Sequence, residues 1–182
     1  GSAGQTPIRV CATPDKQSLT AFALTAAEQE VNFFNTYFKI KYPYEKLDII
    51  GIPDFAAGAM ENAGAITFRE RMLLADEKNA SVGVRKSVAS VIAHELAHQW
   101  FGDMITARSP SSHWLQESFA THYNITAERE CFGQDHFDWA RRQAYVSAIN
   151  TTDKKSISHS QTPTSNIYQK GSVVLEMLKY VT

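Results

Sequence analysis

The chain has 182 residues, of which 43% are hydrophobic and 20% charged, the proportions of a soluble globular protein that can bury a core. Eighteen basic and nineteen acidic residues give a formal net charge of −1, which argues against nucleic acid as a partner, because phosphate binding requires a clustered basic surface. No apolar run approaches the length that spans a bilayer, so we expect no membrane segment in this chain.

The first four residues, Gly1-Ser2-Ala3-Gly4, are typical of a cloning remnant, and we treat residues 5–182 as a single domain. Since the natural N-terminus would then have been replaced, the lack of a secretory leader leaves the compartment open, with the cytoplasm slightly favoured.

The first part of the chain has mainly strand patterns. Residues 8–12, 47–52 and 65–68 predict strands, because they are rich in β-branched or apolar residues and lie next to turn-forming residues. A strand or turn follows at 71–75. The alanine- and aromatic-rich residues 18–38 predict a helix, with Ser18 or Thr20 as its cap.

The second part of the chain predicts helices. The strongest pattern covers residues 81–101 and ends at Gly102. Further helices are predicted at 114–131, at 134–149 and from near Tyr168 to the end, with polar loops at 109–112 and 151–166. Strands early and helices late, without a repeat or an internal boundary, predict an α+β fold.

The helix predicted at 81–101 contains the motif His94-Glu95-Leu96-Ala97-His98. The two histidines lie within about 40° of each other and one turn apart, so both imidazoles can reach one cation. Glu95 falls in the arc of Val84, Val88 and Val91, where we expect it to be largely buried. Burying a carboxylate costs free energy, so we expect this group to have a charged or polar role. Alone, the motif also fits a helix with two surface histidines and an incidental glutamate.

Glu117 follows His98 after eighteen residues, on the next predicted helix. Its carboxylate would complete a three-ligand metal site, which leaves a fourth position for water and is typical of catalytic zinc. Cobalt or manganese could occupy the same ligand set. In isolation Glu117 would be interpreted as an ordinary helical glutamate in a salt bridge.

A third segment makes the pattern specific. Gly58-Ala59-Met60-Glu61-Asn62, followed by the two histidines and then by Glu117, resembles the combined motif of the zinc aminopeptidases typified by aminopeptidase N (the gluzincin aminopeptidases). The similarity continues in order from about Ile8 to the last residues. Its other matching segments are Pro53-Asp54-Phe55, Ile66-Thr67-Phe68-Arg69-Glu70, His98-Gln99-Trp100-Phe101-Gly102-Asp103 and Tyr168-Gln169-Lys170-Gly171.

The resemblance implies a thermolysin-like metallopeptidase catalytic domain, with a small mixed sheet followed by a helical half. It implies one zinc ion, held by His94, His98 and Glu117, and peptides with a free N-terminus as substrates. It further implies that Glu95 is the general base and acid, and that Tyr168 stabilises the oxyanion.

The segment 58–62 distinguishes an aminopeptidase from an endopeptidase within this resemblance. It implies that the Glu61 carboxylate pairs with the α-ammonium group of the substrate, and that Gly58 and Ala59 line the substrate backbone. Met60 and Asn62 belong to the same substrate-binding segment. Without the resemblance, the segment would be interpreted as a tight turn that uses its glycine.

The chain also departs from the family. Ser118 stands where the family commonly has glycine, and residues 109–113 replace an often aromatic and acidic stretch. Family members usually have a β-rich domain before this one and a helical domain after it. An endopeptidase with an open cleft and a zinc-binding fragment with negligible activity therefore remain alternatives; an epoxide hydrolase has only family kinship in its favour.

Overall fold

The computed structural model describes residues 1–151, 156–157 and 166–181. Within them the strands form one mixed sheet in the order β1-β2-β3-β5-β4. The central pairs, β2 with β3 and β3 with β5, are parallel, whereas β1 with β2 and β4 with β5 are antiparallel. The strands are β1 (Ser2–Ala3), β2 (Thr6–Cys11), β3 (Leu47–Ile52), β4 (Ala59–Met60) and β5 (Ala65–Arg69).

The predicted strands at 8–12, 47–52 and 65–68 are therefore confirmed, with small shifts at their ends. Two details differ from the prediction. Residues 59–60, in the segment that would be interpreted as a tight turn without the resemblance, form β4 at the sheet edge. The strand or turn expected at 71–75 begins as a 3-10 turn at Glu70–Met72.

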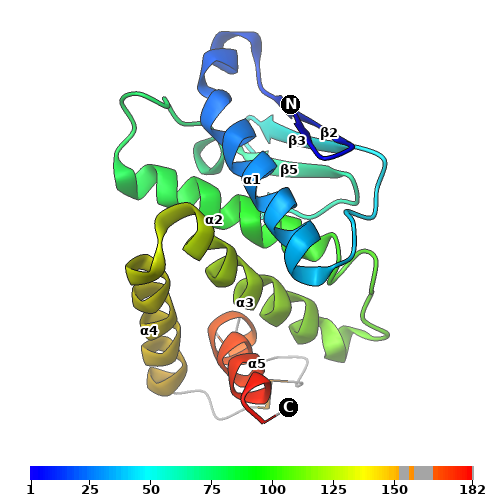
Figure 1. Ribbon diagram of the computed structural model, residues 1–182, viewed down its shortest axis with the longest axis vertical. Coiled ribbons are helices and arrows are strands. Elements are labelled where there is room, and N and C mark those ends of the chain that lie inside the picture. Colours follow the sequence, from blue (N-terminus) through cyan, green and yellow to red (C-terminus); the bar gives the residue numbers. More distant parts are fainter. Residues whose placement is uncertain (152–155, 158–165, 182) are drawn as a thin grey trace.

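Helix α1 (Ala21–Phe38) connects β2 to β3 and covers the sheet together with α2 (Figure 1). It begins three residues later than predicted, because residues Pro14–Leu19 form a 3-10 helix in which Pro14 takes the first position. It ends at Phe38 and is followed by the C-cap residue Lys39, whose φ of 55° is left-handed. Its apolar face is buried against the sheet and against Trp100, whose ring lies 5.8 Å from that of Phe34.

Helix α2 (Val82–His98) begins one residue later than predicted, because Ser81 caps it: the Ser81 side chain accepts a hydrogen bond from the Val84 amide. It ends three residues earlier than predicted. The amides of residues 103, 104 and 105 donate to the carbonyls of residues 98, 99 and 100, five positions back. This wider turn replaces the last helical hydrogen bonds and carries the chain through Gly102 away from the helix axis.

The helical half consists of α3 (His113–Phe132), α4 (Gln134–Asn150) and α5 (Gly171–Lys179). The predicted spans of α3 and α4 are confirmed to within one residue at each end. Helix α3 packs along α2, while α4 and α5 lie at the end of the molecule farthest from the sheet (Figure 1).

Before α5, residues Asn166–Lys170 form a π-helix, so Tyr168 lies inside this turn rather than at the start of an α-helix. Most of the loop predicted at 151–166 falls outside the described residues.

A small mixed sheet followed by helices confirms the α+β prediction. None of the helices in the described part of the chain combines the length and the apolar character needed to cross a membrane.

Candidate active site

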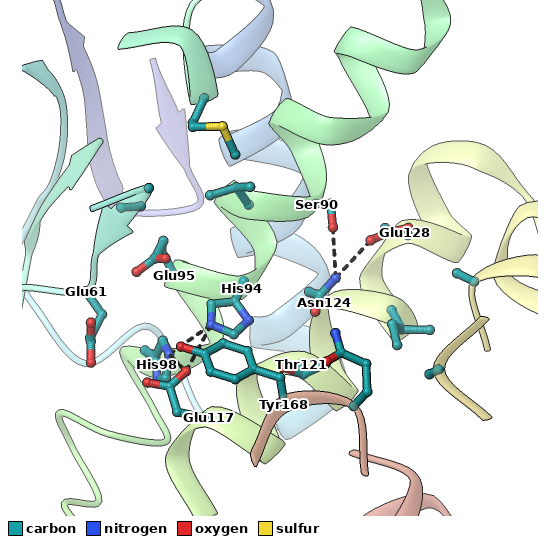
Figure 2. Close-up of a pocket in the computed structure, with 18 of the residues that line it drawn as sticks. Glu61, Ser90, His94, Glu95, His98, Glu117, Thr121, Asn124, Glu128 and Tyr168 are labelled. Carbon is teal, nitrogen blue, oxygen red and sulfur yellow. Dashed lines mark hydrogen bonds and ion pairs between the residues drawn. The ribbon is translucent and has the colours of Figure 1, made fainter. Parts of the chain in front are cut away.

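The two motif histidines face each other on α2, at the boundary between the sheet half and the helical half. Their Nε2 atoms are 3.2 Å apart, and their rings are nearly perpendicular at 86°. Glu117 extends from α3 toward both, with its Oε2 atom 3.3 Å from Nε2 of His94 and 3.4 Å from Nε2 of His98 (Figure 2). The structure thus brings together three donor atoms from two helices.

This arrangement fits a metal ion. The candidate ligand atoms all lie within 4.8 Å of one another. Glu117 Oε2 is buried and has no hydrogen-bond partner among the described residues, so a cation would supply its missing partner. Nδ1 of His98 lies 3.1 Å from the carbonyl oxygen of Phe101; this contact assigns the proton to Nδ1 and leaves the Nε2 lone pair free for a metal. Two imidazoles and a carboxylate are a zinc ligand set.

The second carboxylate oxygen of Glu117 faces a residue that the sequence analysis missed. Nε2 of His113, one turn earlier on α3, lies 3.4 Å from Oε1 of Glu117. Oε1 therefore faces His113 while Oε2 faces the two histidines of α2. The spacing of four residues could have indicated this contact only if the predicted helix, which begins at residue 114, had included His113.

Glu95 is buried, with 7% of its surface exposed, as predicted. Val88 on the same arc is also buried, but Val84 is exposed. The Oε2 atom of Glu95 has no hydrogen-bond partner within the described part of the chain. Burial raises the pKa of this carboxyl to about 8, with Glu61 and Glu117 acting in the same direction, and the charge of a nearby cation would oppose that shift.

A cavity of about 940 Å³ contains all but one of the predicted site residues. Glu61 lies on its sheet side, across from Tyr168 (Figure 2). Asn62 is the exception: its amide donates to Thr67 Oγ1 over 3.2 Å and does not line the cavity. The predicted residues in the lining are Gly58, Ala59, Met60, Glu61, His94, Glu95, His98, Glu117 and Tyr168.

Tyr168 covers the histidine pair from the helical half. Its ring stacks on that of His94, with centroids 5.5 Å apart and planes 12° from parallel. The hydroxyl end of the ring points toward Glu117 and His98 (Figure 2). Burial, reinforced by the negative charge of Glu117, raises the pKa of the Tyr168 hydroxyl, so at neutral pH this group remains a hydrogen-bond donor.

Gln99, the residue after the second histidine, links α2 to the segment that contains Glu61. Its side chain is fully buried. Nε2 donates to the Glu61 carbonyl and to Asp103 Oδ2, both over 2.8 Å. Oε1 accepts from the Gly64 amide over 2.9 Å and from the Tyr42 hydroxyl over 3.0 Å. No local pattern indicated this role, because all but one of these partners are more than thirty positions away in the sequence.

Residues 22–182 match the family model described as the peptidase family M1 domain. The chain belongs to peptidase family M1. Relatives of this M1 chain include endoplasmic reticulum aminopeptidase 2 of Bos taurus, 38% identical over 94% of the chain, and probable aminopeptidase 1 of Sulfurisphaera tokodaii, 43% identical over 94% of the chain. The chain spans 19% and 23% of those two proteins.

The M1 chain has a polar wall in the cavity beyond His94, which the sequence analysis also missed. The Asn124 amide donates to Ser90 Oγ over 3.0 Å and to Glu128 Oε1 over 2.8 Å (Figure 2). Oε2 of Glu128 lies 2.6 Å from Nε2 of His136, and Nζ of Lys86 lies 3.0 Å from Nδ1 of the same ring. Asn124, Glu128 and His136 are buried, and their polar groups are hydrogen-bonded to one another or to Ser90 and Lys86.

Proposed function

We propose that this M1 chain is the catalytic portion of a zinc aminopeptidase, which hydrolyses the first peptide bond of peptides that have a free N-terminus. The observation that carries the proposal is the convergence of His94, His98 and Glu117 in a cavity that also contains the carboxylate of Glu61. The aminopeptidase names of the relatives support it, although the chain spans about a fifth of their length.

His94, His98 and Glu117 would hold the zinc ion. When bound, zinc polarises the scissile carbonyl group and lowers the pKa of a bound water. The ligand set contains no fourth protein donor within the described residues, which suits a catalytic rather than a structural metal.

Glu95 acts as the general base and then as the general acid in this proposal. Its buried carboxylate lies in the same cavity as the ligands and has an oxygen without a partner among the described residues. It takes a proton from the attacking water and passes that proton to the nitrogen of the leaving amine.

Tyr168 donates its hydroxyl hydrogen to the oxyanion that forms when water adds to the carbonyl group. Its raised pKa supports this role, because the hydroxyl keeps its proton at the pH of the reaction. A fixed donor in a water-poor site stabilises the developing charge without reorganisation.

Glu61 makes the enzyme an exopeptidase. A free α-amino group is a cation below its pKa of about 7.7–8.0, and the half-buried carboxylate of Glu61 pairs with it. This ion pair fixes how far the substrate enters, while Gly58 and Ala59 line its backbone. Only the first peptide bond then lies beside His94 and His98.

One assay tests the proposal against its alternatives. Hydrolysis of a leucyl chromogenic substrate and of its N-acetylated form is measured with and without a chelator. We expect chelator-sensitive cleavage of the free amine alone. Cleavage of both forms would indicate an open-cleft endopeptidase, and no cleavage by protein that contains stoichiometric zinc would indicate an inactive metal-binding fragment. Metal analysis of protein purified without added metal distinguishes zinc from cobalt or manganese.

A further inference from the structure

Ser118 follows the proposed ligand Glu117 on α3 and is fully buried. Its hydroxyl does not bond within its own helix, as serine in a helix often does. It donates instead to the carbonyl oxygen of Ile167 over 2.7 Å, across 49 positions in the sequence. Ile167 directly precedes Tyr168, so one hydrogen bond joins the residue beside a zinc ligand to the residue beside the tyrosine.

A second contact holds the same two segments together. A Cβ atom on Gly171 would lie 1.8 Å from Oγ of Ser118 and 2.8 Å from its Cβ. The first residue of α5 therefore approaches Ser118 so closely that residue 171 must be glycine. The hydroxyl is enclosed on one side by the Gly171 backbone and bonded on the other to Ile167.

The backbone between these two contacts is the π-helix Asn166–Lys170. Such turns are rare and frequently occur at functional sites. Ser118 contacts the chain on both sides of Tyr168, at Ile167 inside this turn and at Gly171 directly after it. The position of the Tyr168 ring over His94 is thereby coupled to the side chain of Ser118.

We propose that Ser118 is a positioning residue, which fixes the π-helix so that the Tyr168 hydroxyl stays beside the metal ligands. The role of Tyr168 in stabilising the oxyanion belongs to the proposed function, on which this inference rests. Ser118 itself touches neither substrate nor metal. It acts through the Ile167 carbonyl and the Gly171 backbone.

The first test uses the metal-free protein and is independent of catalysis. Ser118→Ala removes the hydroxyl with little change in volume. We expect amide hydrogen exchange in peptides covering residues 166–175 to become about fivefold faster, as the loss of one buried hydrogen bond implies. The matched control is Thr126→Val, which removes another buried hydroxyl of α3, bonded to the carbonyl of His122 in the same helix. Unchanged exchange in 166–175 for Ser118→Ala would overturn the proposal.

The second test is a double-mutant cycle on the zinc-loaded protein. The phosphonic acid analogue of leucine presents a tetrahedral anion, and its dissociation constant is measured by calorimetry alongside kcat for a leucyl substrate. Ser118→Ala should weaken binding about fivefold and lower kcat more than it raises KM. In a Tyr168→Phe background the same change should have almost no effect, because the hydroxyl to be positioned is gone.

The two tests separate failure of the inference from failure of the proposed function. Equal losses from Ser118→Ala in the parent protein and in the Tyr168→Phe variant would show that Ser118 acts without the tyrosine hydroxyl and would refute the positioning role. Absence of both turnover and phosphonate binding in the parent protein would refute the proposed function, and the exchange measurement would then decide whether Ser118 fixes the 166–171 turn.

Discussion

The side-chain amide of Gln99 donates a hydrogen bond to the backbone carbonyl of Glu61, over 2.8 Å. The same side chain accepts a hydrogen bond from the Gly64 amide. Gln99 follows His98 directly, so a single buried side chain connects the proposed metal helix to both ends of the turn at residues 61–64, which begins with the proposed amine-binding residue Glu61. The distance from the metal ligands to Glu61 is thus set by side-chain hydrogen bonds rather than by a continuous strand or helix.

Gln99→Glu should disrupt the connection between the helix of His94 and His98 and the backbone at Glu61. The new carboxylate keeps the shape of the side chain but faces the Glu61 carbonyl and the Asp103 carboxylate with an acceptor instead of a donor. We expect KM for a free-amine substrate to rise about tenfold, with a smaller change in kcat, because an unsatisfied buried group costs ~1–3 kcal/mol. Steady-state kinetics measures the changes in KM and in kcat separately. Tyr42→Phe is the control, since it removes one bond to Gln99 and none to the turn.

Glu61→Gln tests amine recognition directly. The neutral amide retains the size of the side chain but cannot form an ion pair with the substrate ammonium group. The preference for leucyl over N-acetyl-leucyl substrate should fall by about 10- to 100-fold, since hydrogen bonds to charged groups contribute ~1.5–3 kcal/mol. An equal preference in the variant and the parent would assign amine recognition to another residue. The exposed Glu45→Gln provides a charge-matched control.

Glu95→Gln should retain zinc while losing turnover. The amide cannot accept the proton of the attacking water, and general base catalysis contributes about 10²- to 10⁴-fold. Zinc content is measured by elemental analysis, and kcat by the leucyl assay. Loss of zinc together with activity would mean that Glu95 supports the ligands, and undiminished kcat would refute its role as the base.

Glu30 allows a prediction about the fold, away from the site. This α1 carboxyl is fully buried, its Oε2 atom lacks a hydrogen bond to any described residue, and burial raises its pKa well above the ordinary value, with Glu128 acting in the same direction. The folded protein therefore retains the proton after the unfolded chain has lost it near pH 4.3. This contribution to stability is fully present below that pH and is lost as the pH rises toward the folded-state pKa.

Glu30→Gln keeps the side chain neutral at every pH. It should therefore remove the part of the pH dependence of the unfolding free energy that is due to Glu30. We expect the variant to be more stable than the parent at pH 8 by ~1–3 kcal/mol, and the difference to shrink at pH 4. Urea unfolding at the two pH values measures it. If the free energy of unfolding changed between pH 4 and pH 8 by the same amount in the parent and in the variant, the assignment would be contradicted.

The order of elements and the spacing of His94 and His98 could be predicted from short-range patterns in the sequence. The approach of Glu117 to the two histidines was indicated by resemblance, because Glu117 lies on another helix. The helix containing His94 and His98 follows from the pattern over residues 81–101. Its end could not be predicted, since the turn after His98 depends on amides that bond five residues back. Nothing in residues 99–101 distinguishes that turn from a continued helix.

The surroundings of the ligands depend on contacts between distant segments, which local patterns do not encode. Gln99 is an ordinary polar residue until the fold brings Glu61 and Gly64 to it. Ser118 stands out in the sequence as a departure from glycine, but its bond to Ile167 requires the π-helix before α5. Tyr168 is indicated by resemblance and expected at a helix start, and the π-helix gives it a different backbone.

The boundary between the sheet half and the helical half also divides the reactive groups. Glu61, the histidine pair and Glu95 precede residue 103, whereas Glu117 and Tyr168 follow residue 112. A protein cut once between these positions would yield two pieces, neither with a complete set of ligands. Under the proposed function, hydrolysis by the mixed pieces would report their reassembly, which is the principle of a split-enzyme sensor.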